Sequence, residues 1–142
     1  VITAENIEKC REMVALWYQN HPENYEIQSE KKAIAKAFDH FAAIGMDGWM
    51  LLDGEQVLGF SMGYRMNRTN YDVCFEKAYA DIQGAYAMIN REFSRHIAEK
   101  YPELEFLNRE DDMGGPGLRK AKESYQPTLL LEKCTADLQG GF

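Results

Sequence analysis

The sequence has no apolar run approaching the roughly 20 residues that a helix needs to span a bilayer. Its first residues, 1–5, lack the basic and then apolar pattern of a signal peptide. Cysteine is scarce, and Cys10, Cys74 and Cys134 lie far apart in apolar stretches. This pattern predicts buried thiols in a reducing compartment, without a disulfide framework. We therefore expect a cytoplasmic protein with no integral membrane segment.

Several catalytic signatures are also missing. His21, His40 and His96 stand apart, and no Cys/His spacing resembles a set of metal ligands, so we expect no metal. The absence of a P-loop, a dinucleotide fingerprint and a nucleophile elbow removes the usual support for nucleotide hydrolysis, hydride transfer and serine hydrolysis. With 16 Lys+Arg against 23 Asp+Glu, the net charge of −7 disfavours a protein that grips nucleic acid with its whole surface, and leaves only a local basic patch.

The chain has 142 residues and is 45% hydrophobic, which suffices for one buried core. No internal repeat, low-complexity stretch or linker divides it, so we expect residues 1–142 to form a single domain. Because the first residue is Val1 and not Met, we expect the sequence to be either a fragment of a longer protein or a processed chain.

Apolar residues recur at helical spacing in the first third of the chain. The pattern predicts one helix between a Thr3 cap and a stop at His21-Pro22, and a second helix that Gly45 ends. The repeating positions are Ile7, Cys10, Val14 and Trp17, then Ile34, Ala37, Phe38 and Phe41.

From Gly48 the period is that of strands. We predict a strand over 49–52, a turn in which Gly54 adopts a positive φ, a return strand Gln56–Arg65 and a third strand Tyr71–Tyr79. On the return strand the alternation predicts a nearly bare face of Gly59, Ser61 and Gly63, against which an extended ligand could lie. The opposite face would carry Leu58, Phe60, Met62 and Tyr64, and the third strand would set Val73, Phe75, Lys77 and Tyr79 against Asp72, Cys74, Glu76 and Ala78.

The remaining pattern predicts a helix over 85–101 that ends before Pro102, a strand Leu104–Leu107, a helix Gly117–Tyr125 and a strand Thr128–Thr135. A three-strand meander, followed by a helical crossover and further strands, predicts an α+β fold. Its mixed sheet would have helices on both faces.

The densest polar cluster, 108–127, follows a strand and opens a helix. Its glycines would leave backbone N–H groups free for an anion, which Arg119 and Lys122 could reach from one helix face. In the alternative interpretation Asp111 or Asp112 caps the helix, Pro116 begins it and the basic residues are solvated.

A second small-residue turn, Asp81–Tyr86, enters a helix straight after a strand. Gly84, Ala85 and Tyr86 there could hold an anionic group of a donor, or the segment is an ordinary tight turn. If Glu76 faces a cleft it could act as a general base, although an exposed strand carboxylate has the same sequence pattern. Tyr125 could be the complementary acid, or a core tyrosine with a satisfied hydroxyl.

The element order resembles the acyltransferase fold of the GNAT superfamily. Over roughly residues 48–135, shared motifs resemble the phosphatidylglycerol lysyltransferase C-terminal family, also called DUF2156. The matching residues are Asn108-Arg109-Glu110, Asp112, Gly114, Gly117-Leu118-Arg119, Lys122, Ser124-Tyr125 and Pro127, with Phe75-Glu76-Lys77-Ala78, Gly84-Ala85-Tyr86, Ile89-Asn90 and Glu92-Phe93. Gly115 departs from the aliphatic residue more usual in the family.

The resemblance implies the second of two tandem GNAT-like domains, which transfers an activated acyl or aminoacyl group to an amine or hydroxyl acceptor. The donor would be aminoacyl-tRNA or acyl-coenzyme A, and the acceptor a small molecule or lipid headgroup. Partners would be tRNA and either an N-terminal GNAT-like domain or a second copy. The expected site residues are Glu76 and Tyr125 for catalysis, Arg109, Arg119, Lys122, Ser61 and Gly63 for substrate, and Gly84, Ala85 and Tyr86 for cofactor.

Two alternatives stay open. One is a catalytically silent GNAT-like half that binds a ligand or completes a partner domain. The other is ordinary coenzyme A-dependent N-acetylation, although the turn before Gly84 lacks the fuller glycine pattern usual for pyrophosphate binding.

Overall fold

A computed structural model describes residues 1–21, 25–132, 134 and 136 of the chain. Two helices, α1 (Ile7–Gln19) and α2 (Tyr25–Asp39), form where the apolar periodicity predicts them. The prediction that Gly45 ends the second helix is wrong, because residues 40–45 already form turns. The predicted Thr3 cap is wrong, because the N-cap of α1 is Asn6. Residues 4–6 already form a turn, so the Thr3 carbonyl accepts a hydrogen bond from the Ile7 N–H at 3.0 Å and the Thr3 N–H donates to Asn6 Oδ1 at 2.8 Å.

Four strands form one mixed sheet in the order β1-β2-β3-β4. β1 (Asp47–Asp53), β2 (Gln56–Arg65) and β3 (Asn70–Ala78) are antiparallel neighbours, and the short β4 (Phe106–Asn108) runs parallel to β3. The tight turn between β1 and β2 places Gly54 at φ 57°, as the sequence predicts. This meander with a crossover strand confirms the predicted α+β architecture.

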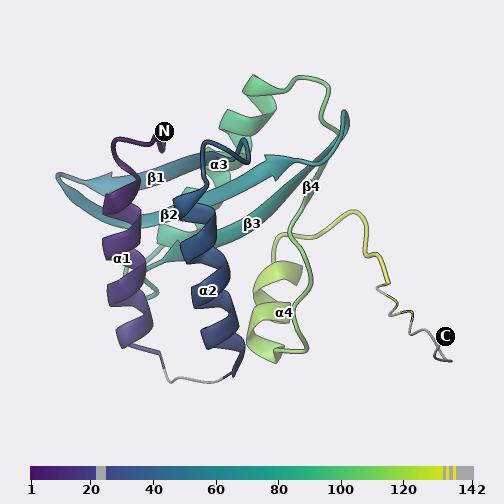
Figure 1. Cartoon of the computed structure of the whole chain (residues 1–142). Coiled ribbons are helices and arrows are strands. Elements are labelled where there is room, and N and C mark those ends of the chain that lie inside the picture. The colour runs from purple at the N-terminus through teal and green to yellow at the C-terminus, as the bar shows by residue number, and fades with distance from the viewer. Residues whose placement is uncertain (22–24, 133, 135, 137–142) are drawn as a thin grey trace, which may run out of the picture. The chain divides into compact units, whose positions relative to one another are not determined.

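Helices cover both faces of this sheet, as Figure 1 shows for α1 and α2 on one side and α3 (Ala85–Lys100) on the other. On the first side Cys10, Val14 and Phe38 belong to one apolar cluster with Phe60 and Met62 of β2. On the second side Phe93 and Ile97 of α3 pack with Tyr71 and Val73 of β3. The apolar stripe of each helix therefore lies against a different face of the sheet.

The prediction of a bare face on β2 is wrong. Ser61 is wholly buried, and Gly59 and Gly63 are buried as well. A Cβ added at Gly63 would lie 2.1 Å from the backbone oxygen of Asp72 and 2.6 Å from the Tyr71 ring. The small residues of β2 therefore allow close approach of β3 and its side chains, and leave no exposed surface for an extended ligand.

The predicted alternation along β3 is also wrong in its first half. Consecutive residues of β2, Met62 and Gly63, pair with Phe75 and Val73, so Cys74 is an extra residue in a β-bulge. Because of the bulge, Val73 shares a face with Glu76 and not with Phe75. Alternation was inferred from an uninterrupted period of two, which a bulge breaks.

The chain forms two compact units, residues 1–110 and 111–142. The second unit contains α4 (Pro116–Glu123), close to the predicted helix. Among its described residues there is no strand, so the prediction of one over Thr128–Thr135 is wrong for 128–132 and 134, while positions 133 and 135 lie outside the described residues. Leu130 and Leu131, expected at its centre, are exposed. Since the described residues of this unit include no strand, they offer this segment no strand to pair with.

No helix in the described part of the chain is both long enough and apolar enough to cross a bilayer.

Candidate active site

Glu76 sits at the centre of a polar cluster on the α3 side of the sheet. Arg109 donates to Glu76 Oε1 from Nη2 at 2.8 Å and to Oε2 from Nη1 at 3.4 Å. Asn90 of α3 adds a third hydrogen bond, from Nδ2 to Oε2 at 3.3 Å. The Glu76 side chain is 10% exposed and that of Arg109 26%, so the pair is largely withdrawn from water. The alternative of an exposed strand carboxylate at Glu76 is therefore wrong.

Ser61 lies opposite Glu76 on the neighbouring strand. Its Oγ is buried and has no hydrogen-bond partner among the described residues. A buried hydroxyl without a partner is costly, and such groups in a polar cluster merit a functional explanation. The structure thus brings Ser61, Glu76 and Arg109 of the expected site onto one side of one sheet and adds Asn90.

The end of the sheet opens beside this cluster. β3 pairs with β4 only over Asn70–Asp72. From Val73 to Ala78, the edge of β3 that faces away from β2 has no strand partner in the described residues. The Ala78 carbonyl already accepts a hydrogen bond from Trp17 Nε1 at 3.0 Å, and backbone groups before it on this edge can bond to an extended ligand that lies along it.

The predicted small-residue turn leads into α3. Gly84 is the N-cap at φ 83°, no side chain caps the helix, and the first turn carries no acidic residue. Ala85 is buried and Tyr86 is half-buried, and burial raises the pKa of the Tyr86 hydroxyl above its ordinary value. The Ala85 N–H donates to the backbone oxygen of Ile82 at 3.1 Å, while the helix dipole leaves partial positive charge at this end of α3.

In the second unit, the loop before α4 already binds a carboxylate from the same loop, that of Asp112. The Asp112 carboxylate accepts hydrogen bonds from the Gly114 N–H at 2.8 Å and from Arg119 Nη2 at 3.2 Å. These bonds, with that of Arg119 the larger cause, lower the pKa of Asp112 to about 2. Asp112 does not cap α4, because Gly115 is the N-cap, and Pro116 begins the helix as the alternative interpretation had it.

Lys122 and Tyr125 belong to the same unit. Lys122 donates from Nζ to the backbone oxygen of Asp111 at 2.7 Å, so it faces the same loop as Arg119. Tyr125 follows α4 and is 42% exposed, which excludes the alternative of a core tyrosine. A basic pair facing one loop, with an exposed phenol next to its helix, can bind an anionic group within this unit.

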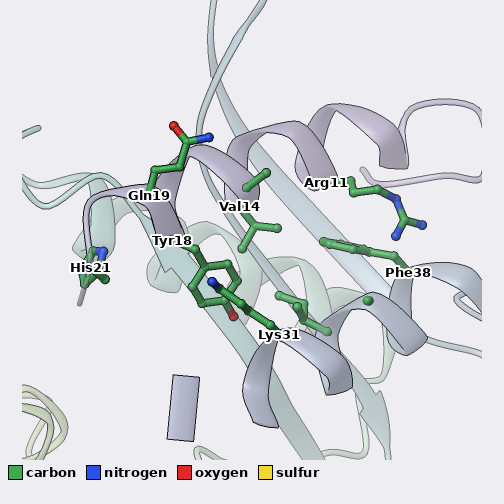
Figure 2. Close-up of a pocket in the computed structure, with 10 residues that line it drawn as sticks. Arg11, Val14, Tyr18, Gln19, His21, Lys31 and Phe38 are labelled. Atoms are coloured by element: carbon green, nitrogen blue, oxygen red, sulfur yellow. The ribbon is translucent and has the colours of Figure 1, made fainter. Parts of the chain in front are cut away.

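Sequence reasoning missed a groove between α1 and α2, shown in Figure 2, with a volume of about 490 Å³. Val14 and Phe38 line it with apolar surface, while the Arg11 guanidinium lies 5.2 Å from the Phe38 ring centroid and Lys31 Nζ 5.1 Å from that of Tyr18. The amphipathic pattern of these helices predicts only that their apolar stripes pack in the core. In the sequence, the basic residues beside those stripes were the one feature that could have indicated a groove. The groove can accept an apolar group, while Arg11 at its edge is already paired with Glu8 and Asp39.

Comparison with known proteins identifies the family. A sequence model described as phosphatidylglycerol lysyltransferase, C-terminal, matches residues 1–136. A conserved protein of unknown function from Bacteroides thetaiotaomicron is 38% identical, with a TM-score of 0.83 over 91% of this chain. The chain spans only 43% of the length of that protein. No curated protein matches the sequence.

Two acetyltransferases share the fold at low identity. Ribosomal-protein-alanine N-acetyltransferase from Brucella melitensis biovar Abortus 2308 is 12% identical with a TM-score of 0.63, covering 99% of this chain and 96% of its own. An aminoglycoside acetyltransferase from an uncultured soil metagenomic sample is 12% identical with a TM-score of 0.61, over 99% and 93%. The chain thus has the GNAT fold, and it belongs to the phosphatidylglycerol lysyltransferase C-terminal family of acyltransferase-like proteins.

Proposed function

We propose that this chain transfers an activated acyl or aminoacyl group to an amine or hydroxyl acceptor, with Glu76 at the reacting centre. The observation that carries the proposal is the withdrawn Glu76–Arg109 pair beside the open edge of β3. A carboxylate that accepts three hydrogen bonds, beside a strand edge that has no strand partner among the described residues, suits proton transfer during acyl transfer.

Glu76 can accept the proton on one particular oxygen. Oε1 receives the short 2.8 Å bond from Arg109, whereas the bonds to Oε2 are 3.3 and 3.4 Å. In the proposed step the acceptor N–H or O–H gives its proton to Oε2 as its nitrogen or oxygen bonds to the donor carbonyl carbon. The bond from that carbon to the thioester sulfur or ester oxygen then breaks, and the leaving group takes a proton from a general acid or from water.

In this proposal the acyl donor does not lie along the small-residue face of β2 that the sequence predicts for it. Gly59, Ser61 and Gly63 are buried, so the acyl arm lies along the free edge of β3 in this proposal, and Ser61 supports Glu76 from the neighbouring strand. The negative end of the donor meets the turn of Gly84, Ala85 and Tyr86 at the positive end of the α3 dipole, where the Ala85 N–H already donates to Ile82 O. In the second unit Arg119 exchanges Asp112 for an anionic group of donor or acceptor, which Lys122 also contacts.

We propose aminoacyl-tRNA as the donor and a small molecule or lipid headgroup as the acceptor, supported by the family to which the chain belongs. The neighbours that are acetyltransferases support acyl-coenzyme A as the second candidate donor. The chain spans 43% of the Bacteroides protein, which supports an arrangement in which a further GNAT-like domain or a second copy completes the site. The same observation favours the rival function, a silent half that only binds.

Thermal-shift binding separates these cases. The purified chain is heated with acetyl-coenzyme A, coenzyme A or an aminoacyl-tRNA mimic, at low and at high salt. A ligand that binds the folded state raises the melting temperature. We expect a shift with the tRNA mimic that high salt removes. A shift with coenzyme A alone would redirect the proposal to acetyl transfer, and the absence of any shift would contradict it. Because a silent half also binds, a shift is followed by a turnover measurement with the same ligand.

A further inference from the structure

Three potential metal ligands meet where β3 and β4 separate. Asp72 and Cys74 lie on β3, and Glu110 follows β4 by two residues. One ligand atom from each side chain lies within 4.8 Å of the others. All three residues belong to the first unit of the chain.

Asp72 supplies an independent sign that something is bound there. Its residue is 6% exposed, and its Oδ1 is buried without a hydrogen-bond partner among the described residues. A buried carboxylate oxygen that has given up water without gaining a donor is costly. A cation in contact with Oδ1 or shared by the carboxylate removes that cost.

The spacing of two of the ligands already suits one tetrahedral ion. Zinc bonds of about 2.3 Å to sulfur and about 2.0 Å to oxygen, at a tetrahedral angle, separate the two ligand atoms by roughly 3.5 Å. Cys74 Sγ lies 3.6 Å from Asp72 Oδ2. Glu110 is exposed, and its carboxylate oxygen lies within 4.8 Å of the other two ligand atoms.

We propose that Asp72, Cys74 and Glu110 bind a Zn²⁺ ion. A thiolate ligand favours zinc over magnesium or calcium, which prefer oxygen donors alone. Three protein ligands leave the fourth position for water or an added ligand. On binding, the thiol proton passes to solvent and the sulfur bonds to the metal. The ion would link the β-bulge at Cys74 to the segment after β4, at the point where β3 and β4 stop pairing.

The sequence pattern gave no sign of this site, since a spacing such as Cys-x-x-Cys was absent. Asp72 and Cys74 are two apart, but the bulge at Cys74 and the parallel pairing of Asp72 with Asn108 are what bring Glu110 to them. Neither feature can be inferred from ligand spacing along the chain.

The test is a titration of the whole chain with Zn²⁺, and with Co²⁺ as a spectroscopic probe, in a Cys134→Ser background. That substitution removes the exposed thiol, and Cys10 is wholly buried. We expect one equivalent of Zn²⁺ to bind and Co²⁺ to give a thiolate charge-transfer band. Cys74→Ser should abolish the band, and Glu110→Gln should weaken Zn²⁺ affinity roughly tenfold or more.

Glu105→Gln is the matched control, because Glu105 is another exposed carboxylate near β4. It should leave the affinity unchanged. Should Cys74→Ser fail to fold, as its circular dichroism would reveal, the exposed Glu110→Gln still decides. The proposal is overturned if no Zn²⁺ binds, if Mg²⁺ competes equally, if Glu105→Gln and Glu110→Gln weaken binding equally, or if an organic ammonium ion binds there in place of the metal.

Discussion

The guanidinium of Arg109 and the carboxylate of Glu76 meet through two hydrogen bonds, one to each carboxylate oxygen. The two residues are 33 positions apart, on β3 and directly after β4. The pair therefore joins two strands that share only a three-residue ladder. Because both side chains are largely withdrawn from water, each charge is stabilised mainly by its partner. The coupling between the two residues can be measured as a free energy of unfolding.

Glu76→Gln and Arg109→Gln should each lower the free energy of unfolding by about 2 kcal/mol, because each leaves a partly buried charge without its partner. The double variant should lose less than the sum of the two, with a coupling of about 1 kcal/mol. Denaturant unfolding of the four proteins measures this. Arg91→Gln is the control, since its pair with Glu92 is more exposed, and it should change stability by less than about 0.5 kcal/mol. Strict additivity would show that the pair is not coupled.

Gly63→Ala should destabilise the first unit. The added Cβ would lie 2.1 Å from the backbone oxygen of Asp72, so β2 and β3 must move apart, at a cost of about 2 to 3 kcal/mol. Gly117→Ala in α4 is the control, because nothing lies within 4 Å of its added Cβ. The free energy of unfolding measured by denaturant should fall for the first variant and not for the second. Equal values would mean that β2 and β3 do not approach so closely.

The Asp112 carboxyl should titrate near pH 2 instead of at its ordinary value of 3.8. A carboxyl whose pKa is lowered on folding stabilises the folded state fully above its unfolded pKa, and the effect is lost as the pH falls from about 4 to about 2. NMR titration of the wild type and of Arg119→Gln measures the shift. In the variant the pKa should rise toward 3.8. An unchanged value would exclude Arg119 as the main cause.

The pattern of the sequence was sufficient for most elements of the first unit. Helical periodicity and the strand alternation around Gly54 are local properties, and α1, α2, β1, β2 and α3 follow them. The small residues of β2 were predicted as an open surface because the sequence shows that they lack side chains, but not that Tyr71 and Asp72 fill the space. The β-bulge at Cys74 could not be predicted from the sequence either, since it depends on how β2 and β3 pair.

The candidate site was predicted in part. The strand alternation predicts that Glu76 and Lys77 point to opposite faces, so that Glu76 could face a cleft. The structure adds the two residues that hydrogen-bond to its carboxylate, Asn90 and Arg109. Arg109 was reached only through the family resemblance, and the role of Asn90 needed its position on α3 opposite β3. The glycine loop before α4 was predicted as open to an anion, whereas Asp112 of the same loop already occupies Gly114 and Arg119. A carboxylate of the same loop lies close to these donors, and the amino-acid composition does not show which carboxylate will bind them.

Lys122→Ala should raise the KM for an anionic donor by about tenfold while changing kcat less, because a single charged hydrogen bond to a bound group contributes about 1.5 kcal/mol or more. The effect should shrink at high salt. Lys120→Ala on the same helix is the matched control and should leave KM unchanged. An equal fall in kcat with unchanged KM would place Lys122 in the chemical step and not in binding.

The most direct measurement is transfer itself. The purified chain is mixed with labelled acetyl-coenzyme A or aminoacyl-tRNA and a panel of amine and hydroxyl acceptors, and labelled product is counted over time for the wild type and for Glu76→Gln. We expect product from one donor class, with the rate falling at least about a hundredfold in the variant. The variant should keep the ligand-induced rise in melting temperature. If wild type and Glu76→Gln transfer at the same rate, or if a donor binds the wild type and no product forms with any acceptor, Glu76 is not the base of an acyltransferase in this chain.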